Sequence, residues 1–132
     1  MADSMQFDLV SPERRLASMQ AREVRIPGAE GDLTAMPDHA PLITTLRPGI
    51  LTVVTESGSH DYAVTGGFAE ITAGGTSVLA EQAAPVAEMT AERIGALIEA
   101  ATAAAGKVQG EAKDAADKLV ADFLALRAAL GV

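Results

Sequence analysis

The chain has 132 residues and a mass of 13.5 kDa, which suits one compact unit, or a small domain with an appendage, and leaves no room for two large domains. Its net charge of -8 and pI near 4.6 argue against electrostatic binding to nucleic acid, because that binding needs Lys and Arg side chains that neutralise phosphates. The lack of cysteine excludes disulfides, thiolate catalysis and cysteine-ligated metal.

The part before Pro85 alternates apolar and polar residues with the period of half-buried strands. Four runs place apolar side chains on one face: Phe7 and Leu9, Val24 and Ile26, Leu51 and Val53, and Tyr62 and Val64. Turn signals separate the runs, at Ser11-Pro12, Pro27-Gly28, Pro48-Gly49, Ser57-Gly58, Gly66-Gly67 and Gly74-Gly75. Short strands at this spacing predict a β-sandwich or flattened barrel, since a parallel α/β sheet would need helices between them.

The part after Pro85 is rich in alanine and predicts two helices. Thr90 is a candidate N-cap, and the apolar residues Ile94, Leu97, Ile98 and Ala101 follow at helical spacing. Gly106 and Gly110 bracket a break, and the second helix then carries the apolar stripe Ala112, Ala116, Leu119, Phe123, Leu126 and Leu130. We therefore expect a β-sandwich over residues 1–86 and an antiparallel two-helix hairpin over residues 87–132. Because contacts between alanines bury little apolar surface, we expect the hairpin to be stabilised by packing against the sandwich and to be separable from it.

Neither end of the sequence has the pattern of a membrane or export segment. The stretch MADSMQFDLV lacks the basic and long apolar parts of a secretory signal. The apolar stretch near the C-terminus is interrupted by Asp122 and Arg127 and is shorter than the roughly 20 residues that cross a bilayer. With the acidic charge, this predicts contact with a membrane only through partner proteins.

Four pieces of the strand-rich part carry a family resemblance: FDLVSPE at 7–13, VRIPGAEGDLTAMPDHAPLITTLRPG at 24–49, VTGGFAEI at 64–71 and SVLAEQA at 77–83. Together they closely resemble the epsilon subunit of bacterial F-type ATP synthases. The resemblance implies the same sandwich and hairpin, in a noncatalytic central-stalk subunit of a proton-translocating enzyme, without a cofactor or an active site. It implies the gamma subunit and the c-ring as partners, the alpha and beta subunits as partners of the hairpin, and a peripheral place on the cytoplasmic face of the inner membrane.

The resemblance also implies roles for the glycine- and proline-rich stretch. Glu30, Gly31 and Asp32 match the acidic loop that meets the c-ring, where exposed charges contribute orientation more than affinity. His39 is expected near the same surface, either fixing its loop by hydrogen bonds or touching the ring. The apolar residues Met36, Leu42 and Ile43 belong either to the core or to the contact with gamma.

The start of the first helix departs from the family. Many bacterial members bind ATP there through an aliphatic-Asp-x-x-Arg-Ala motif, and the matching piece here is MTAERI at 89–94. Arg93 is the remaining candidate for a nucleotide contact, since Thr90 and Ile94 replace the aspartate and alanine. Beyond Val86, seven carboxylates and five basic side chains give a net charge of -2. In the family, the extended, inhibitory form of the hairpin relies on basic residues that meet acidic catalytic subunits. We expect a subunit that couples rotation but inhibits ATP hydrolysis weakly.

Two other interpretations stay open at this point. A free-standing β-sandwich that binds a small ligand would need a concave apolar pocket. A hydrolase could use Asp38 and His39 with Ser57 or Ser59, although no nucleophile-elbow pattern is present. His39, His60 and a carboxylate lack metal-ligand spacing, and we expect no metal.

Overall fold

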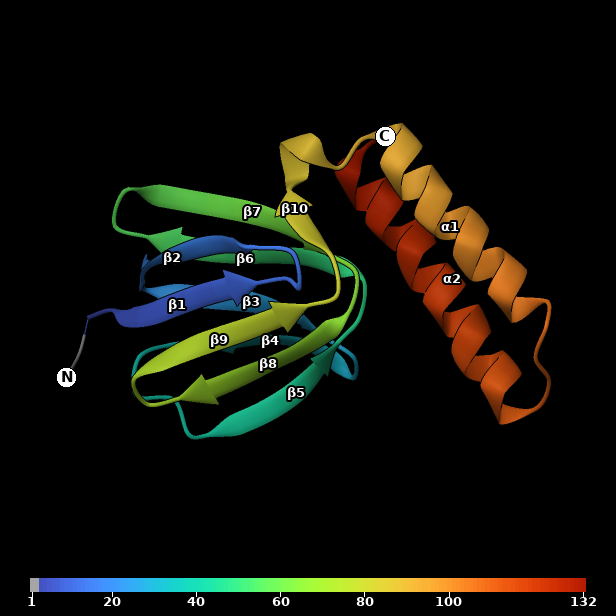
Figure 1. Cartoon of the computed structure of the whole chain (residues 1–132). Helices are drawn as coiled ribbons and strands as arrows, with labels where there is room; N and C mark the ends of the chain where they lie inside the picture. Colours follow the sequence, from blue (N-terminus) through green and yellow to red (C-terminus); the bar gives the residue numbers. More distant parts are fainter. Residues whose placement is uncertain (1–2) are drawn as a thin grey trace.

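Ten strands precede two helices in the computed structural model, which describes residues 3–132. The strands are β1 (Met5–Val10), β2 (Arg15–Ala21), β3 (Glu23–Gly28), β4 (Gly31–Ala35), β5 (Leu42–Leu46), β6 (Gly49–Thr55), β7 (Gly58–Val64), β8 (Gly67–Thr72), β9 (Gly75–Ala80) and β10 (Ala83–Pro85). A short 3-10 turn, η1 (Val86–Glu88), leads to the helices α1 (Ala91–Ala105) and α2 (Glu111–Leu130). The predicted order of a β-sandwich followed by a helical hairpin is confirmed (Figure 1).

The strands form two packed layers (Figure 1). One layer has the order β4-β3-β6-β7-β10 and the other β5-β8-β9-β1-β2, and the single pair of Gly28 with Leu46 joins them. Neighbouring strands are antiparallel except β1 and β9, which run parallel. Arg22, between β2 and β3, also links the layers, because its backbone N donates to the carbonyl of Val54 in β6 at 2.7 Å.

The turns lie at two opposite ends of the sandwich, because the chain reverses direction at the end of each antiparallel strand. The helix end carries residues 11–14, 29–30, 47–48, 65–66 and 81–82, and the far end carries residues 22, 36–41, 56–57 and 73–74. Backbone hydrogen bonds join neighbouring turns at each end, from Thr65 N to Gln82 O (3.1 Å) and from Asp38 N to Ala73 O (3.1 Å). This division decides which of the predicted site residues can act together.

The predicted apolar faces form the core between the layers. Phe7, Leu9, Val24, Ile26, Leu51, Val53, Tyr62 and Val64 are all buried. Alternate residues of a strand point to one face, so each run places two side chains in the same interior. Burial also raises the pKa of the Tyr62 phenol, because a charged phenolate is poorly solvated there.

Pro27 and Gly28 do not turn the chain, which corrects the prediction from their sequence. They end β3 and pair with Asp32 and Gly31 of β4, so the reversal falls one step later. A Pro-Gly pair favours a turn in isolation, but here pairing with β4 and, at Gly28, with β5 keeps it extended. A Cβ on Gly28 would lie 2.6 Å from the carbonyl oxygen of Gly31, so the close approach of the two strands requires glycine.

The hairpin packs on β6 and β7. Thr90 caps α1 as predicted, with its Oγ1 accepting from the backbone N of Arg93 at 3.2 Å. The shared cluster consists of Ala63, Met89, Ile94, Ala101, Phe123 and Leu126. Val120 rather than the predicted Leu119 packs against it, because the buried Phe123 and Leu126 fix the rotation of α2 and leave Leu119 exposed. Among the described residues, no helix is long and apolar enough to span a membrane.

Candidate functional site

The predicted acidic turn is the tip of the β3–β4 hairpin and lies at the helix end. Gly28 pairs with Gly31, which leaves Ala29 and Glu30 as a two-residue turn. Gly31 has φ +140°, a backbone conformation that favours glycine. The N of Ala29 donates to the carbonyl of Thr45 at 2.9 Å and ties the turn to β5. Glu30 is exposed and has no ion-pair or hydrogen-bond partner within residues 3–132.

Asp32, by contrast, is paired with Arg47. Nη2 of Arg47 donates to Oδ1 of Asp32 at 2.5 Å, and Nη1 donates to the carbonyl of Gly28 at 2.6 Å. The side chain of Arg47 is 28% exposed and that of Asp32 79%. The two carboxylates that the sequence places together therefore differ, since one is free and the other is neutralised within the chain.

His39 lies at the far end, so its predicted place near the acidic turn is wrong. The five residues of β4 separate the two sites, and at about 3.3 Å per residue they span roughly 16 Å. The N of His39 donates to Met36 O at 3.1 Å, with Asp38 at φ +66°, which is a tight turn with proline in its second position. Nδ1 of His39 lies 2.5 Å from the carbonyl oxygen of Ala40. The hydrogen bonds of His39 thus hold its own loop.

The structure does not assemble the hydrolytic or metal groupings considered from the sequence. Within residues 3–132, no hydrogen bond joins His39 to Asp38 or to a serine, and Ser57 instead contacts Thr55. His60 lies on β7 opposite Val53. No group of three or more His, Cys, Asp or Glu in this part of the chain is arranged to hold a metal ion.

An exposed apolar face covers the outer side of β5, β8 and β9. It consists of Ile43, Phe68 and Leu79, which are 67%, 46% and 46% exposed. Phe68 pairs directly with Leu79, and Thr45, two residues after Ile43, pairs with Phe68. A groove of about 620 Å³ continues from Phe68 and Leu79 toward β1. Exposed apolar clusters of this kind mark contacts with other proteins.

Of the three predicted apolar contact residues, only Ile43 belongs to this apolar face. Leu42 precedes it in β5, points to the other side of the sheet, and is exposed at the margin. Met36 is exposed at the far end, beyond β4. The sequence analysis missed Phe68 and Leu79, although both alternate with buried neighbours in β8 and β9, which is the signal for an outward position.

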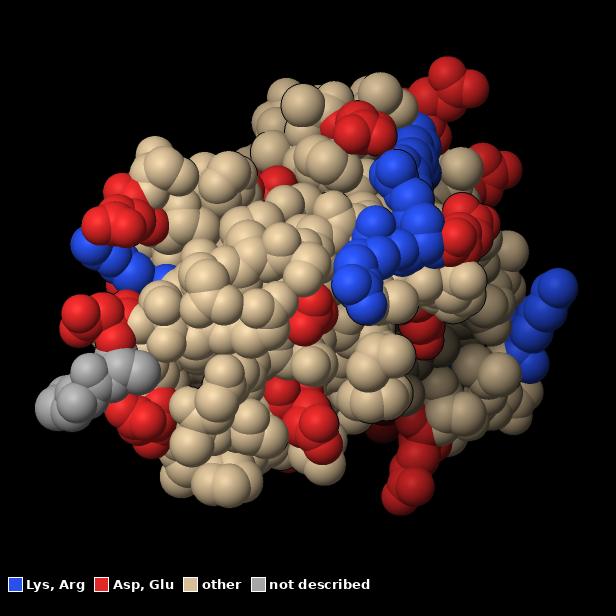
Figure 2. Space-filling model, turned by 60° about the vertical axis from the view of Figure 1, so that its left-hand side comes forward, with Lys and Arg blue, Asp and Glu red and all other residues tan. Residues whose placement is uncertain are grey.

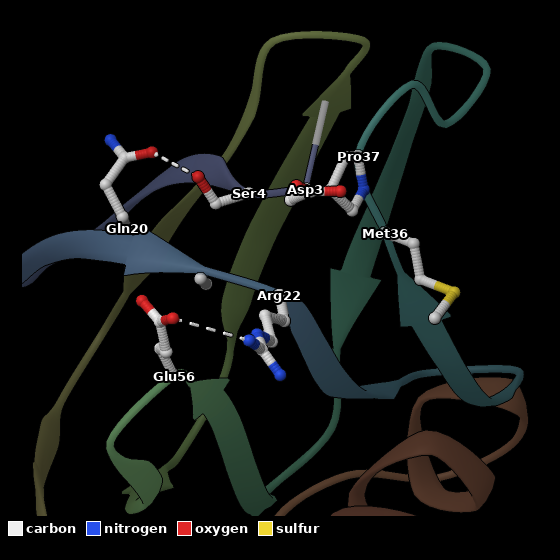
Figure 3. A pocket seen from close by; sticks show the side chains of 8 residues that line it. Asp3, Ser4, Gln20, Arg22, Met36, Pro37 and Glu56 are labelled. Atoms are coloured by element: carbon white, nitrogen blue, oxygen red, sulfur yellow. Dashed lines mark hydrogen bonds and ion pairs between the residues drawn. The ribbon is translucent and has the colours of Figure 1, made fainter. Parts of the chain in front are cut away.

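A cavity of about 840 Å³ lies at the far end beside the β2–β3 corner (Figure 3). It is lined by Asp3, Ser4, Gln20, Ala21, Arg22, Met36, Pro37 and Glu56. Arg22 pairs with Glu56 at 3.7 Å, and Ser4 donates to Gln20 at 3.0 Å, so these polar groups satisfy one another. The lining of the cavity is polar and apolar in similar measure, unlike the mainly apolar pockets that enclose small ligands.

Arg93 lines a smaller crevice, about 370 Å³, at the helix end with Arg14, Glu13 and Glu81. Arg14 also faces Glu88 of η1 at 3.9 Å. A phosphate in this crevice would meet two carboxylates as well as two guanidinium groups. On the side shown in Figure 2, acidic side chains are dispersed, and the basic ones form one narrow strip and separate groups at the left and right edges.

Comparisons with known proteins show which chains are similar to this one. Residues 4–86 match the family model described as "ATP synthase, Delta/Epsilon chain, beta-sandwich domain". The chain is 59% identical over 131 residues to the ATP synthase epsilon chain of Fuscovulum blasticum, with 99% of each chain covered. It is 52% identical over 139 residues to that of Paracoccus denitrificans, covering 100% of this chain and 94% of the other.

Solved structures with low identity share the fold. A chain in the structure of the Euglena gracilis mitochondrial ATP synthase, "OSCP/F1/c-ring in rotational state 1", superposes with a TM-score of 0.76 at 23% identity, over 98% of this chain and 83% of that one. A chain in the Tetrahymena thermophila mitochondrial "central stalk/cring" structure superposes with a TM-score of 0.69 at 17% identity, over 97% and 96%. The sandwich followed by two helices is thus also the fold of those chains.

Proposed function

The chain belongs to the family of ATP synthase epsilon chains, which are noncatalytic subunits of the F-type enzyme, and we propose that it joins the gamma subunit to the c-ring in the central stalk. The observation that carries this proposal is the presence of two separate contact surfaces on one sandwich, the apolar face and the acidic turn. The apolar face suits a permanent protein partner, and the acidic turn suits a polar one.

The gamma subunit is the proposed partner of the apolar face. Ile43, Phe68 and Leu79 would lose their exposed apolar surface to it, at roughly 25 cal/mol per Å² buried. Leu42 points to the other side of the sheet and would reach gamma only at the margin, and Met36 would do so only if the interface continued to the far end. The set of residues that gamma covers therefore distinguishes a contact with the sheet face from a contact with the loops.

The c-ring is the proposed partner of the acidic turn, formed by Glu30, Gly31 and Asp32. A two-residue turn on a paired hairpin is a stiff projection, so a charge on it keeps its direction as the ring moves. The proposal leaves His39 away from the ring contact, because β4 carries it to the other end of the sandwich. Ladders of backbone hydrogen bonds resist shear, which suits an element that transmits torque.

The hairpin is proposed as a separable unit, residues 87–132, that stays docked and inhibits ATP hydrolysis weakly. Its docking rests on apolar contacts of Met89, Ile94, Phe123 and Leu126 with the outer side of β6 and β7. The net charge of -2 beyond Val86 gives little attraction to acidic regions of the alpha and beta subunits. Arg93 remains the one nucleotide-contact candidate, and the neighbouring Glu13 and Glu81 weaken its attraction for phosphate.

The cellular place that follows is peripheral, on the cytoplasmic face of the inner membrane. The chain would be held there by gamma and the c-ring rather than by its own contact with lipid. The net charge of -8 supports this, because acidic proteins are repelled by anionic headgroups.

The test is binding of the full chain to purified gamma subunit, with a charge placed on the apolar face. Ile43→Asp should weaken capture of gamma strongly, since a buried carboxylate without a partner is costly. Leu124→Asp is the matched control, because Leu124 is also an exposed leucine-sized residue but lies on α2. Equal capture by both variants would contradict the apolar face as the contact with gamma, and no capture by the natural chain would contradict the proposal and favour a free-standing module.

A further inference from the structure

We propose that Arg47 is the positioning residue of the acidic turn, and that it leaves Glu30 rather than Asp32 as the carboxylate that meets the partner. The inference rests on the proposed contact of this turn with the c-ring. It adds that the two carboxylates of the turn have different roles. Asp32 helps to orient the hairpin tip by pairing with Arg47, and Glu30 faces the partner.

Arg47 holds both strands of the β3–β4 hairpin at once. Its backbone N donates to the carbonyl of Pro27 at 3.0 Å, and its Nη1 donates to the carbonyl of Gly28 at 2.6 Å. Its Nη2 donates to Oδ1 of Asp32, the residue that pairs with Pro27 across the hairpin. Three hydrogen bonds from one residue to two strands fix the direction in which the tip projects.

The guanidinium suits this arrangement better than an ammonium group. Two of its nitrogens point to two different oxygens, one on each strand, whereas lysine offers a single nitrogen on a flexible stem. Arg47 also lies beside a crevice of about 300 Å³ whose other wall is α2, with Leu126 and Ala125 among its lining residues. The docked helix therefore limits the space into which Arg47 can swing.

The charges of the turn follow from the pairing. Arg47 cancels the charge of Asp32, and the turn keeps the single negative charge of Glu30 at its tip. A partner with a basic or hydrogen-bond-donating side chain in its loop would meet Glu30 first. It would have to displace Arg47 to use Asp32 in the same way.

The experiment uses ATP synthase from which this subunit has been removed, and titrates the full chain back at low and high salt. Glu30→Gln should weaken binding about two- to five-fold and flatten its salt dependence, as expected for one exposed charge pair. Arg47→Gln should weaken binding by a similar factor although it makes the turn more negative. Arg47→Lys should retain part of the loss, because it restores the charge but holds only one of the two oxygens.

The double variant Asp32→Asn, Arg47→Gln separates orientation from charge. It should bind more weakly than the natural chain yet keep the natural salt dependence, because Glu30 is still free. Thermal unfolding of each variant shows whether the sandwich is intact, and the salt dependence is a readout that a general loss of stability would not change.

Each contrary result points to a different failure. Stronger binding by Arg47→Gln, or a flattened salt dependence in the double variant, would overturn the role of Arg47 while leaving the ring contact in place. A loss with Glu30→Gln but none with Arg47→Gln would do the same. Unchanged binding by Glu30→Gln, with normal binding of the natural chain, would overturn the inference, and unchanged binding by the double variant as well would overturn the ring contact itself.

Discussion

The sandwich and the hairpin are stabilised by very different amounts of buried apolar surface. The sandwich buries Phe7, Leu9 and Ile71 completely, from strands that are far apart in sequence. In the hairpin, α1 buries one large residue, Ile94, and its other buried positions are alanines. The hairpin therefore owes its order to the sandwich on which it lies, whereas the sandwich has an interior of its own.

The largest expected effect comes from removing a core side chain of the sandwich. Phe7→Ala should lower the free energy of unfolding by about 3–5 kcal/mol, through lost burial and the cavity that remains. Because the hairpin depends on the sandwich, both should unfold together in urea. Leu124→Ala, at an exposed position of α2, should change the midpoint little. A hairpin that stays folded when the sandwich has melted would contradict the comparison.

A smaller and more local effect is expected at the docking surface. Phe123→Ala should cost about 2–4 kcal/mol, and should speed amide hydrogen exchange in α2 while the exchange of β1 and β9 stays slow. The matched control is Leu119→Ala on the exposed side of the same helix. If the strands lost protection as much as α2, the two regions would form one cooperative unit, against the proposed division.

Two glycines test how far the sandwich depends on its turns. Gly67 has φ +116°, and a Cβ there would collide with the carbonyl oxygen of Leu79, so Gly67→Ala should destabilise by about 1–3 kcal/mol. Within residues 3–132, no heavy atom lies near the position of the missing Cβ of Gly74, and Gly74→Ala should be nearly neutral. Calorimetry of both variants checks the contrast. Equal melting temperatures would show that the β7–β8 turn adapts.

The smallest effect is at the start of the hairpin. Thr90→Ala removes the N-cap of α1 and should cost about 1 kcal/mol. The measurement is amide hydrogen exchange. It should become faster at Arg93, because the backbone N–H of Arg93 loses the Thr90 hydroxyl as its acceptor. Thr102→Ala serves as the control, because Thr102 lies inside α1 and its hydroxyl donates to the carbonyl of Ile98. An unchanged amide at Arg93 would mean that packing of Ile94 alone holds this end.

Local patterns in the sequence predicted the parts of the fold that depend on local rules. Alternation identified buried pairs such as Leu51 and Val53, and helical spacing identified Ile94 and Phe123. The prediction that Pro27 and Gly28 form a turn failed because pairing with β4 and β5 overrides the local preference. Such pairings connect residues distant in sequence, and periodicity does not report them.

The candidate site was predicted less well than the fold. The sequence marked Glu30 and Asp32 as neighbours but gave no sign that Arg47, fifteen residues later than Asp32, neutralises one of them. It also grouped His39 with the acidic turn, since the two are close along the chain. A strand of five residues between them is enough to place them at opposite ends of a sandwich.

The most direct test of the account is cross-linking from the two ends of β4 in the reassembled enzyme. Because the chain has no cysteine, Glu30→Cys and His39→Cys each introduce a single reactive thiol. The account predicts that position 30 cross-links to the c-ring and that position 39 does not. Cross-linking of the ring from position 39, or from neither position in a complex that contains the chain, would contradict it.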